Sequence, residues 1–171
     1  MSHGLAGRIP VHATAIVPCR ASLPFGAEVD SAVLLLGDSG SGKSGVALRL
    51  VGMGAKLLAD DQVLLSVESG RLRAEPPQMG HGHIEIRGIG ILKLPASGPA
   101  PVLFCVRLSQ EATPRMPEKE FFHVEGLQIA LPPRLFRLNG LEAAAPALIA
   151  AAAAALQNGA LLPEDGSFFQ A

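Results

Sequence analysis

Short apolar runs, separated by polar and Pro/Gly-rich stretches, dominate the first two thirds of the chain. The run 33–36 is continuous Val-Leu-Leu-Leu and predicts a buried strand, whereas 83–87 alternates apolar and polar residues and predicts a half-covered strand. Apolar residues at helical spacing predict a helix at 45–54. The alanine-rich segment 141–156 predicts another, with Pro146 in its first turns and Gly159 beyond its end. The predicted strands are 11–17, 33–36, 56–59, 63–67, 83–87, 101–108 and 127–131. Strands with few helices predict an α/β fold.

The remaining stretches predict turns and loops. Glu68-Ser69-Gly70 is typical of a hairpin turn between two strands. Residues 20–30 and 76–82 are marked as connections by proline, glycine and polar residues. The segment 110–119 mixes charges with Pro114 and Pro117, which predicts an exposed and mobile loop.

The eight residues after the run 33–36 form a complete phosphate-binding loop that leads into the first predicted helix. Strand, loop and helix in this order are the context in which the motif binds nucleotides. Its glycines let backbone N–H groups turn toward phosphate oxygens, and the helix N-terminus adds partial positive charge. Lys43 reaches the outer phosphates, and the Ser44 hydroxyl holds the bridging Mg²⁺. The predicted nucleotide-binding residues are Gly37, Asp38, Ser39, Gly40, Ser41, Gly42, Lys43 and Ser44. We therefore expect the chain to bind a nucleoside triphosphate.

Two pairs of charged residues add candidate chemistry. Asp60 and Asp61 stand at the end of the apolar run 56–59, where a carboxylate can support magnesium or act as a base. Adjacent carboxylates are also common in ordinary turns. Glu85 and Arg87 occupy alternate positions of a predicted strand, so that both project from the same face.

Three stretches together resemble the HPr kinase/phosphorylase family, which is named for the small phosphocarrier protein of the bacterial phosphotransferase system. They are the Gly-Asp-Ser-Gly-x-Gly-Lys-Ser loop, the Leu-x-Ala-Asp-Asp step and the Glu-x-Arg-Gly-x-Gly-Ile stretch. The resemblance runs from about His12 to Asn139. It implies a mixed sheet with a P-loop and flanking helices, a core like that of phosphoenolpyruvate carboxykinases. It also implies a serine kinase that transfers phosphate from ATP to HPr with Mg²⁺.

The resemblance implies roles for the residues of the loop and the signature stretch. Lys43 matches the phosphate-contacting lysine of the family, and Ser44 matches its magnesium-ligating hydroxyl. Glu85 matches the second magnesium ligand.

It also implies a set of groups for proton transfer. Asp61 falls 18 positions after Lys43, where the family has the proton acceptor for the attacking serine. Asp60 matches the neighbour that supports a histidine, and His12 is the best match for that histidine. Arg115, in the loop 110–119, matches the catalytic arginine more weakly.

Several features depart from the family pattern. The histidine is followed by Ala13 rather than glycine, and the stretch 132–139 keeps the arginine spacing but lacks Pro-Gly. The missing Pro-Gly makes phosphorolysis of phosphoserine-HPr less expected than the kinase reaction. A short lead before His12 predicts a single catalytic domain over 1–171 without the family's separate N-terminal domain.

Association is also expected. The family assembles as a hexamer, and this chain has apolar residues expected to be exposed, namely Phe121, Phe122, Phe168 and Phe169. The helical segment 143–156 carries few large side chains, so it packs either on its own sheet or on a neighbouring subunit.

Composition excludes other classes of function. A net charge of −1 and the absence of Trp and Tyr argue against nucleic-acid binding. An apolar run of about 20 residues is absent and the start lacks a signal pattern, so we expect a cytoplasmic protein away from membranes.

Cys19 and Cys105 have the pattern of reduced thiols. His81 and His83 lack a third ligand in the sequence and are read as loop residues.

Two other functions fit parts of the sequence. The chain is alternatively a small-molecule kinase with a carboxykinase-like core, although the histidine and lysine set for a dicarboxylic acid is not found. It is also alternatively an ATP-binding sensor read by a partner, although retention of the Asp60–Asp61 pair and Glu85 argues against a non-catalytic role.

Overall fold

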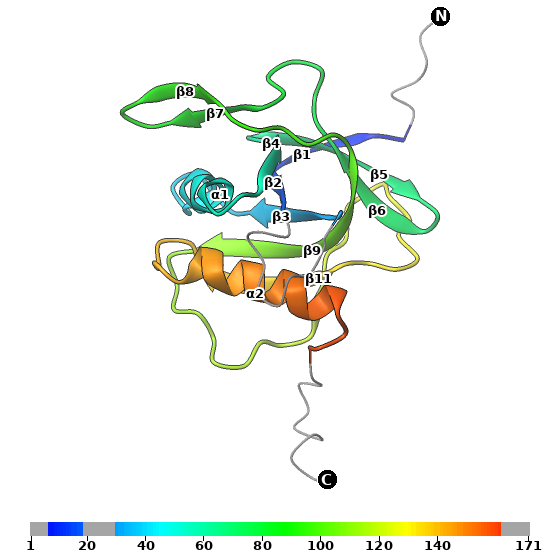
Figure 1. Cartoon of the computed structure of the whole chain (residues 1–171). Coiled ribbons are helices and arrows are strands. Elements are labelled where there is room, and N and C mark those ends of the chain that lie inside the picture. The colour runs from blue at the N-terminus through cyan, green and yellow to red at the C-terminus, as the bar shows by residue number, and fades with distance from the viewer. Residues whose placement is uncertain (1–6, 19–29, 162–171) are drawn as a thin grey trace, which may run out of the picture.

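The apolar run at 33–36 forms strand β3 (Ala32–Leu36), which is buried along its whole length. It lies between the parallel strand β9 (Ala100–Ser109) and the antiparallel strand β2 (Thr14–Val17). A strand with neighbours on both sides and both faces covered requires apolar residues at successive positions, which explains the continuous pattern. The computed structural model describes residues 7–18 and 30–161 of the chain (Figure 1).

The strands form one curled, mixed sheet and a separate hairpin. The main sheet has the order β1-β5-β6-β9-β3-β2-β4, and β11 pairs with both β9 and β10. Strand β9 joins two parts of the sheet, because its first residues pair with β6 while the rest pair with β3 and β11. The other strands are β1 (Ile9–His12), β4 (Lys56–Ala59), β5 (Gln62–Glu68), β6 (Arg71–Glu75), β7 (His83–Ile86), β8 (Gly90–Lys93), β10 (Glu120–Phe121) and β11 (Arg134–Asn139). Strands β7 and β8 form the separate hairpin.

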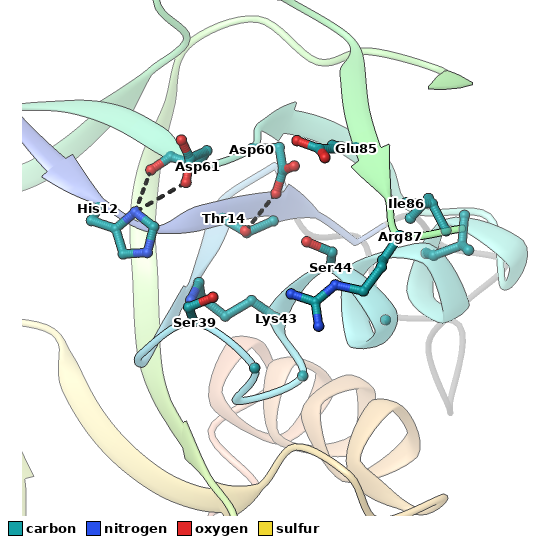
Figure 2. A pocket seen from close by; sticks show the side chains of 14 residues that line it. His12, Thr14, Ser39, Lys43, Ser44, Asp60, Asp61, Glu85, Ile86 and Arg87 are labelled. Atoms are coloured by element: carbon teal, nitrogen blue, oxygen red, sulfur yellow. Dashed lines mark hydrogen bonds and ion pairs between the residues drawn. The ribbon is translucent and has the colours of Figure 1, made fainter. Parts of the chain in front are cut away.

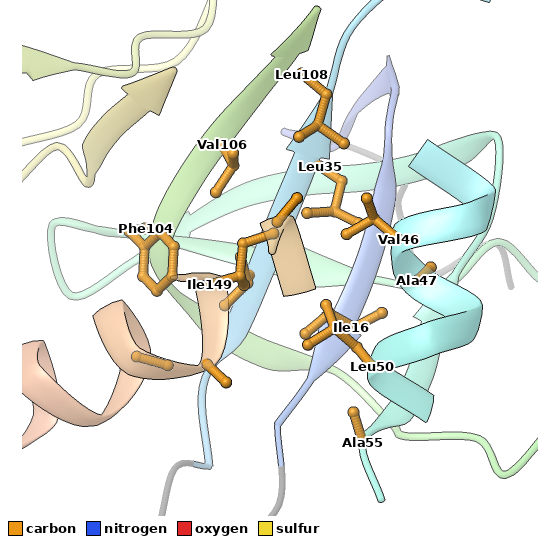
Figure 3. Close-up of a cluster of buried hydrophobic side chains, with 14 of the residues drawn as sticks. Ile16, Leu35, Val46, Ala47, Leu50, Ala55, Phe104, Val106, Leu108 and Ile149 are labelled. Atoms are coloured by element: carbon orange, nitrogen blue, oxygen red, sulfur yellow. The ribbon is translucent and has the colours of Figure 1, made fainter. Parts of the chain in front are cut away.

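Both helices cover the same face of the central strands. Helix α1 (Lys43–Gly52) and helix α2 (Ala145–Gln157) pack on a buried cluster that includes Leu35, Phe104 and Val106 (Figure 3). The opposite face packs against β5 and β6 in a second cluster. The prediction of an α/β fold with a mixed sheet is therefore confirmed, with both helices on one side and strands on the other.

The alanine-rich helix packs within its own domain. Its buried positions are Ala145, Pro146, Ile149, Ala150, Ala153 and Ala154, with Pro146 in the first turn as predicted. Small side chains let the helix backbone approach the sheet closely. This packing resolves the alternative left open by the sequence in favour of the chain's own sheet.

Several sequence expectations differ from the structure. The predicted strand 11–17 is two strands separated at Ala13, because β1 pairs with β5 while β2 pairs with β3 and β4. The predicted strand 127–131 is not a strand. Leu127 and Ile129 instead pack against the second cluster from a loop, and Leu131 is exposed and makes only an isolated bridge to Arg71. Strands β8, β10 and β11 were not predicted. Phe122 is buried rather than exposed.

Other expectations are met or fall outside the described residues. Ser69 and Gly70 have positive φ angles and form the predicted hairpin turn between β5 and β6. Burial raises the pKa of the Cys105 thiol far above its ordinary value, so this thiol is unreactive at neutral pH. Cys19, Phe168, Phe169 and nearly all of 20–30 lie outside the described residues. Within the described residues, none of the helices is long and apolar enough to span a membrane.

Candidate active site

The loop between β3 and α1 depends on glycine at its sharpest bends. Gly37, Gly40 and Gly42 have φ angles of 141°, 84° and 98°, which residues with a Cβ rarely adopt. A Cβ at Gly37 would also overlap the carbonyl oxygen of Leu108. Gly42 caps α1 without a side-chain hydrogen bond, and the first turn of this helix has no acidic residue. The first N–H groups of α1 are therefore available to bind an anion such as phosphate.

The side chain of Lys43 is held inside the same loop. It is 8% exposed, and its Nζ donates hydrogen bonds to the carbonyl oxygens of Gly37 (2.5 Å) and Asp38 (3.0 Å). These partners are neutral backbone groups, so they do not neutralise the ammonium charge. The loop consequently combines backbone donors, a helix N-terminus and a positive side chain, which are the three elements needed to hold phosphates.

A cleft of about 550 Å³ lies beside the loop and brings distant parts of the chain together. Its walls come from the phosphate-binding loop, α1, β1, β2, the turn after β4 and the β7 end of the hairpin (Figure 2). The lining residues are His12, Thr14, Ser39, Gly40, Gly42, Lys43, Ser44, Gly45, Leu48, Asp60, Asp61, Glu85, Ile86 and Arg87. The predicted catalytic and metal-binding residues thus share one cleft, with the exception of Arg115.

The two carboxylates are separated by a tight turn. The N–H of Gln62 donates to the carbonyl oxygen of Asp60 at 2.7 Å, and Asp61 between them has a φ of 63°. Aspartate tolerates this left-handed conformation better than most residues, although the turn remains strained. Strained backbone of this kind is frequent at functional sites. The turn directs the neighbouring side chains toward different partners.

Each carboxylate has its own partner. The Nδ1 of His12 lies 3.1 Å from Asp61 Oδ1 and 3.0 Å from the Asp61 carbonyl oxygen. The buried Thr14 hydroxyl donates to Asp60 Oδ1 at 2.8 Å. The pairing implied by resemblance therefore needs correction, because His12 contacts Asp61 rather than Asp60. The cause is the left-handed turn, which places Asp61 beside the end of β1.

The hairpin β7–β8 supplies the outer wall of the cleft. Glu85 and Arg87 both line it, as expected for alternate positions on one face. In Figure 2 the Arg87 guanidinium reaches over Ser44 toward Lys43, while Glu85 lies on the Asp60 side. The described residues contain no group of three His, Cys, Asp or Glu side chains arranged to hold a metal ion. A magnesium ion at Ser44 and Glu85 would therefore depend on nucleotide oxygens and water for its other ligands.

The arginine predicted from the loop 110–119 lies elsewhere. Arg115 is exposed, and none of the described residues lining the cleft comes from this loop. The loop is attached to the end of β11, because the N–H of Asn139 donates to Thr113 Oγ1 at 3.0 Å and Asn139 Nδ2 donates to the Gln110 carbonyl at 3.2 Å. The catalytic role of Arg115 stays a prediction.

Two polar side chains that line the cleft, those of Thr14 and Arg87, are not among the site residues predicted from the sequence. Arg87 was noted for its strand position, and its place in the signature stretch was the available signal. Thr14 starts β2 two positions after His12, which ends β1. The sequence does not indicate the break between these strands, so it does not show that both side chains line one cleft. The hydrogen bond between Thr14 and Asp60 joins residues that are 46 positions apart, so no local sequence pattern predicts it.

The fold and cleft define a P-loop protein with carboxylates placed opposite its phosphate-binding loop. Residues 28–97 match the family described as HPr Serine kinase C-terminal domain. A solved structure, the Hpr(Ser) kinase/phosphatase from Coxiella burnetii, is similar with a TM-score of 0.62 and 25% identity. That similarity covers 83% of this chain and 91% of that chain.

The chain is also similar to two curated proteins over a shorter stretch. The HPr kinase/phosphorylase of Clostridium novyi is 44% identical over 64 residues, which is 37% of this chain and 21% of that protein. The HPr kinase/phosphorylase of Thermoanaerobacter sp. is 49% identical over 63 residues, covering 36% of this chain and 21% of that protein. The matches span about a fifth of the length of these relatives. The resemblance to the HPr kinase/phosphorylase family is confirmed over the phosphate-binding loop, the acidic pair and the signature stretch.

Proposed function

We propose that this chain is a magnesium- and ATP-dependent serine kinase that phosphorylates an HPr-like phosphocarrier protein in the cytoplasm. The observation that carries the proposal is the shared cleft, in which the phosphate-binding loop with Lys43 faces Asp61 and its partner His12. The names of the similar proteins supply the substrate class. Neither the cleft nor the names of the similar proteins specifies the reaction alone.

Binding of ATP would use the groups already directed into the loop. Backbone N–H groups at the start of α1 and the Lys43 ammonium would hold the phosphates. Ser44 and Glu85 would hold Mg²⁺ from opposite walls of the cleft. When bound, this ion would neutralise charge on the phosphate oxygens. The glycine cradle and the uncapped, acid-free helix start fit such a ligand set.

Asp61 would accept the proton of the attacking serine. As the serine Oγ forms a bond to the γ-phosphorus, the bond between that phosphorus and the ADP oxygen breaks, and the hydroxyl proton passes to the Asp61 carboxylate. His12 lies within hydrogen-bonding distance of this carboxylate and orients it. Arg87 and, once substrate is bound, Arg115 would add positive charge near the transferred group.

The reverse phosphorolysis is not favoured by the residues of 132–139. Arg137 makes two hydrogen bonds of 2.8 Å with Glu120, and the Arg134 guanidinium lies over the rings of Phe121 and Phe136. Neither arginine lines the cleft in the described structure. We therefore propose the kinase reaction as the principal activity.

Homo-oligomer formation is part of the proposal. Large apolar side chains are exposed on the hairpin β7–β8 and near its base, including Met79 (87%), Ile89 (72%) and Ile91 (72%). Such residues are frequent at protein contacts. A hexamer is the expected form by family resemblance.

The direct test is incubation of the chain with Mg²⁺, ATP and purified HPr, followed by mass spectrometry of the HPr. We expect a single phosphoserine that depends on both ATP and Mg²⁺. A chain that binds ATP but leaves HPr unmodified, and that modifies no small acceptor, would instead support the ATP-sensor alternative.

A further inference from the structure

Thr14 is a buried polar residue in the wall of the cleft. It is the first residue of β2, it is 0% exposed, and its backbone lies in register with Leu35 of β3. Its Oγ1 donates to Asp60 Oδ1 at 2.8 Å, which joins the central sheet to the turn after β4 (Figure 2). A hydroxyl buried at this depth requires a hydrogen-bond partner, and a carboxylate is a strong one.

The bond fixes one carboxylate of an adjacent pair. Asp61 has His12 beside it, whereas Asp60 has Thr14. Two neighbouring carboxylates repel each other, and each would otherwise turn toward the nearest positive or hydrogen-bonding group. In Figure 2 Asp60 lies between Asp61 and Glu85, within the same cleft as Lys43. A freely rotating Asp60 would therefore compete with Asp61 for His12, the group that orients Asp61.

Threonine suits this task physically. Its β-branched side chain has few χ1 states on a strand, and neighbouring residues fill the space around it. The hydroxyl therefore points in a fixed direction before any ligand arrives. The strained turn at Asp61 fixes the backbone of the pair, and Thr14 fixes the side chain that the turn leaves free to rotate.

We propose that Thr14 is a positioning residue for phosphoryl transfer, acting through Asp60. This inference rests on the proposed kinase function. Thr14 holds the Asp60 carboxylate apart from Asp61 and His12, which leaves His12 to orient Asp61 and Asp61 to accept the proton of the attacking hydroxyl. Thr14 is therefore expected to contribute to the rate of transfer rather than to ATP binding.

The test compares Thr14→Val, which keeps shape and burial, with Thr14→Ser, which keeps the hydroxyl. We expect Thr14→Val to lower kcat for HPr phosphorylation roughly tenfold or more, as for loss of a hydrogen bond to a charged group. The Kd for ATP and the KM for HPr should change less than about twofold, and Thr14→Ser should retain most of the activity. The unfolding temperatures of both variants show whether any loss of activity comes from a less stable fold. If Thr14→Val is unstable, the activity of Thr14→Ser still tests the role of the hydroxyl.

A double-mutant cycle with Asp60→Ala gives the second readout. If Thr14 acts through Asp60, Thr14→Val should cause no further loss of single-turnover transfer in the Asp60→Ala background. A full additional loss there would overturn the inference, and so would a Thr14→Val enzyme as active as the wild type. A wild-type chain that does not phosphorylate HPr would instead overturn the proposed function, so the two failures are distinguishable.

Discussion

Gly42, in the phosphate-binding loop, lies directly against Gly140. A Cβ added to Gly42 would lie 2.6 Å from the Gly140 carbonyl oxygen, and a Cβ on Gly140 would overlap the Ser41 carbonyl oxygen. The N–H of Gly140 also donates to the Ser109 carbonyl at the end of β9. The path of the loop therefore depends on a segment that follows β11, far away in the sequence.

Gly140→Ala should weaken ATP binding without removing any ligand group. One methyl group here displaces the loop backbone, and overpacking of this kind costs about 1–3 kcal/mol. We expect a roughly tenfold or larger rise in the Kd for ATP, measured by calorimetry, with a lower unfolding temperature. Gly52→Ala is the matched control, since a Cβ there meets nothing within 4 Å. Equal ATP affinities of Gly140→Ala and wild type would show that this contact does not shape the loop.

Lys43→Ala should abolish HPr phosphorylation and greatly weaken ATP binding. Lys43 supplies the ammonium group that is held within the loop, and its loss leaves the loop itself without a charged donor for the outer phosphates. Calorimetry with MgATP and a phosphotransfer assay measure the two effects. Lys56→Ala, at an exposed position that starts β4, should leave both unchanged. Unchanged nucleotide affinity of Lys43→Ala would remove the basis of the site.

Asp61→Asn should preserve ATP binding while lowering transfer by roughly 10²–10⁴-fold, the range for loss of a positioned general base. Asparagine keeps the shape and tolerates the φ of 63°, so the turn should survive. Single-turnover transfer to HPr, with ATP affinity measured alongside, separates chemistry from binding. Asp60→Asn is the comparison, and a larger loss in that variant would reverse the assignment of the base.

The sequence predicted the elements whose signals are local. The run 33–36, the glycine-rich loop and the following helix are consecutive, so their pattern predicted the strand, loop and helix that form one end of the cleft. The break at Ala13 could not be predicted in this way. It arises because the residues before it pair with β5, whereas the residues after it pair with β3 and β4. The contact of Thr14 with Asp60 depends on the same long-range pairing. Strand β11 follows two prolines and contains two arginines, the half-buried Arg134 and the exposed Arg137, so its sequence lacks a clear apolar strand pattern.

The proposed homo-oligomer should depend on the exposed apolar residues of the hairpin β7–β8. Ile89 and Ile91 are each 72% exposed, and burial of such side chains in a contact is favourable. We expect multi-angle light scattering to give an assembly larger than a monomer, and Ile89→Ser/Ile91→Ser to shift it toward smaller species. Leu131→Ser, at another exposed apolar position, is the control. A fully active monomer at working concentration would contradict the proposal.

Arg87 and Arg115 are the two candidates for stabilising the transferred phosphoryl group. Their alanine variants should differ in ATP affinity and in transfer to HPr. Arg87 lines the cleft and reaches toward Lys43, so Arg87→Ala should weaken ATP binding and lower kcat even without HPr, as measured by ATP hydrolysis in water. Arg115 lies outside the cleft on the loop 110–119, so Arg115→Ala should leave ATP affinity unchanged and reduce transfer to HPr alone. Arg71→Ala, an exposed arginine on β6, is the control for loss of charge. Full transfer activity of Arg115→Ala would exclude Arg115 from the reaction and leave Arg87 as the arginine that faces the phosphates.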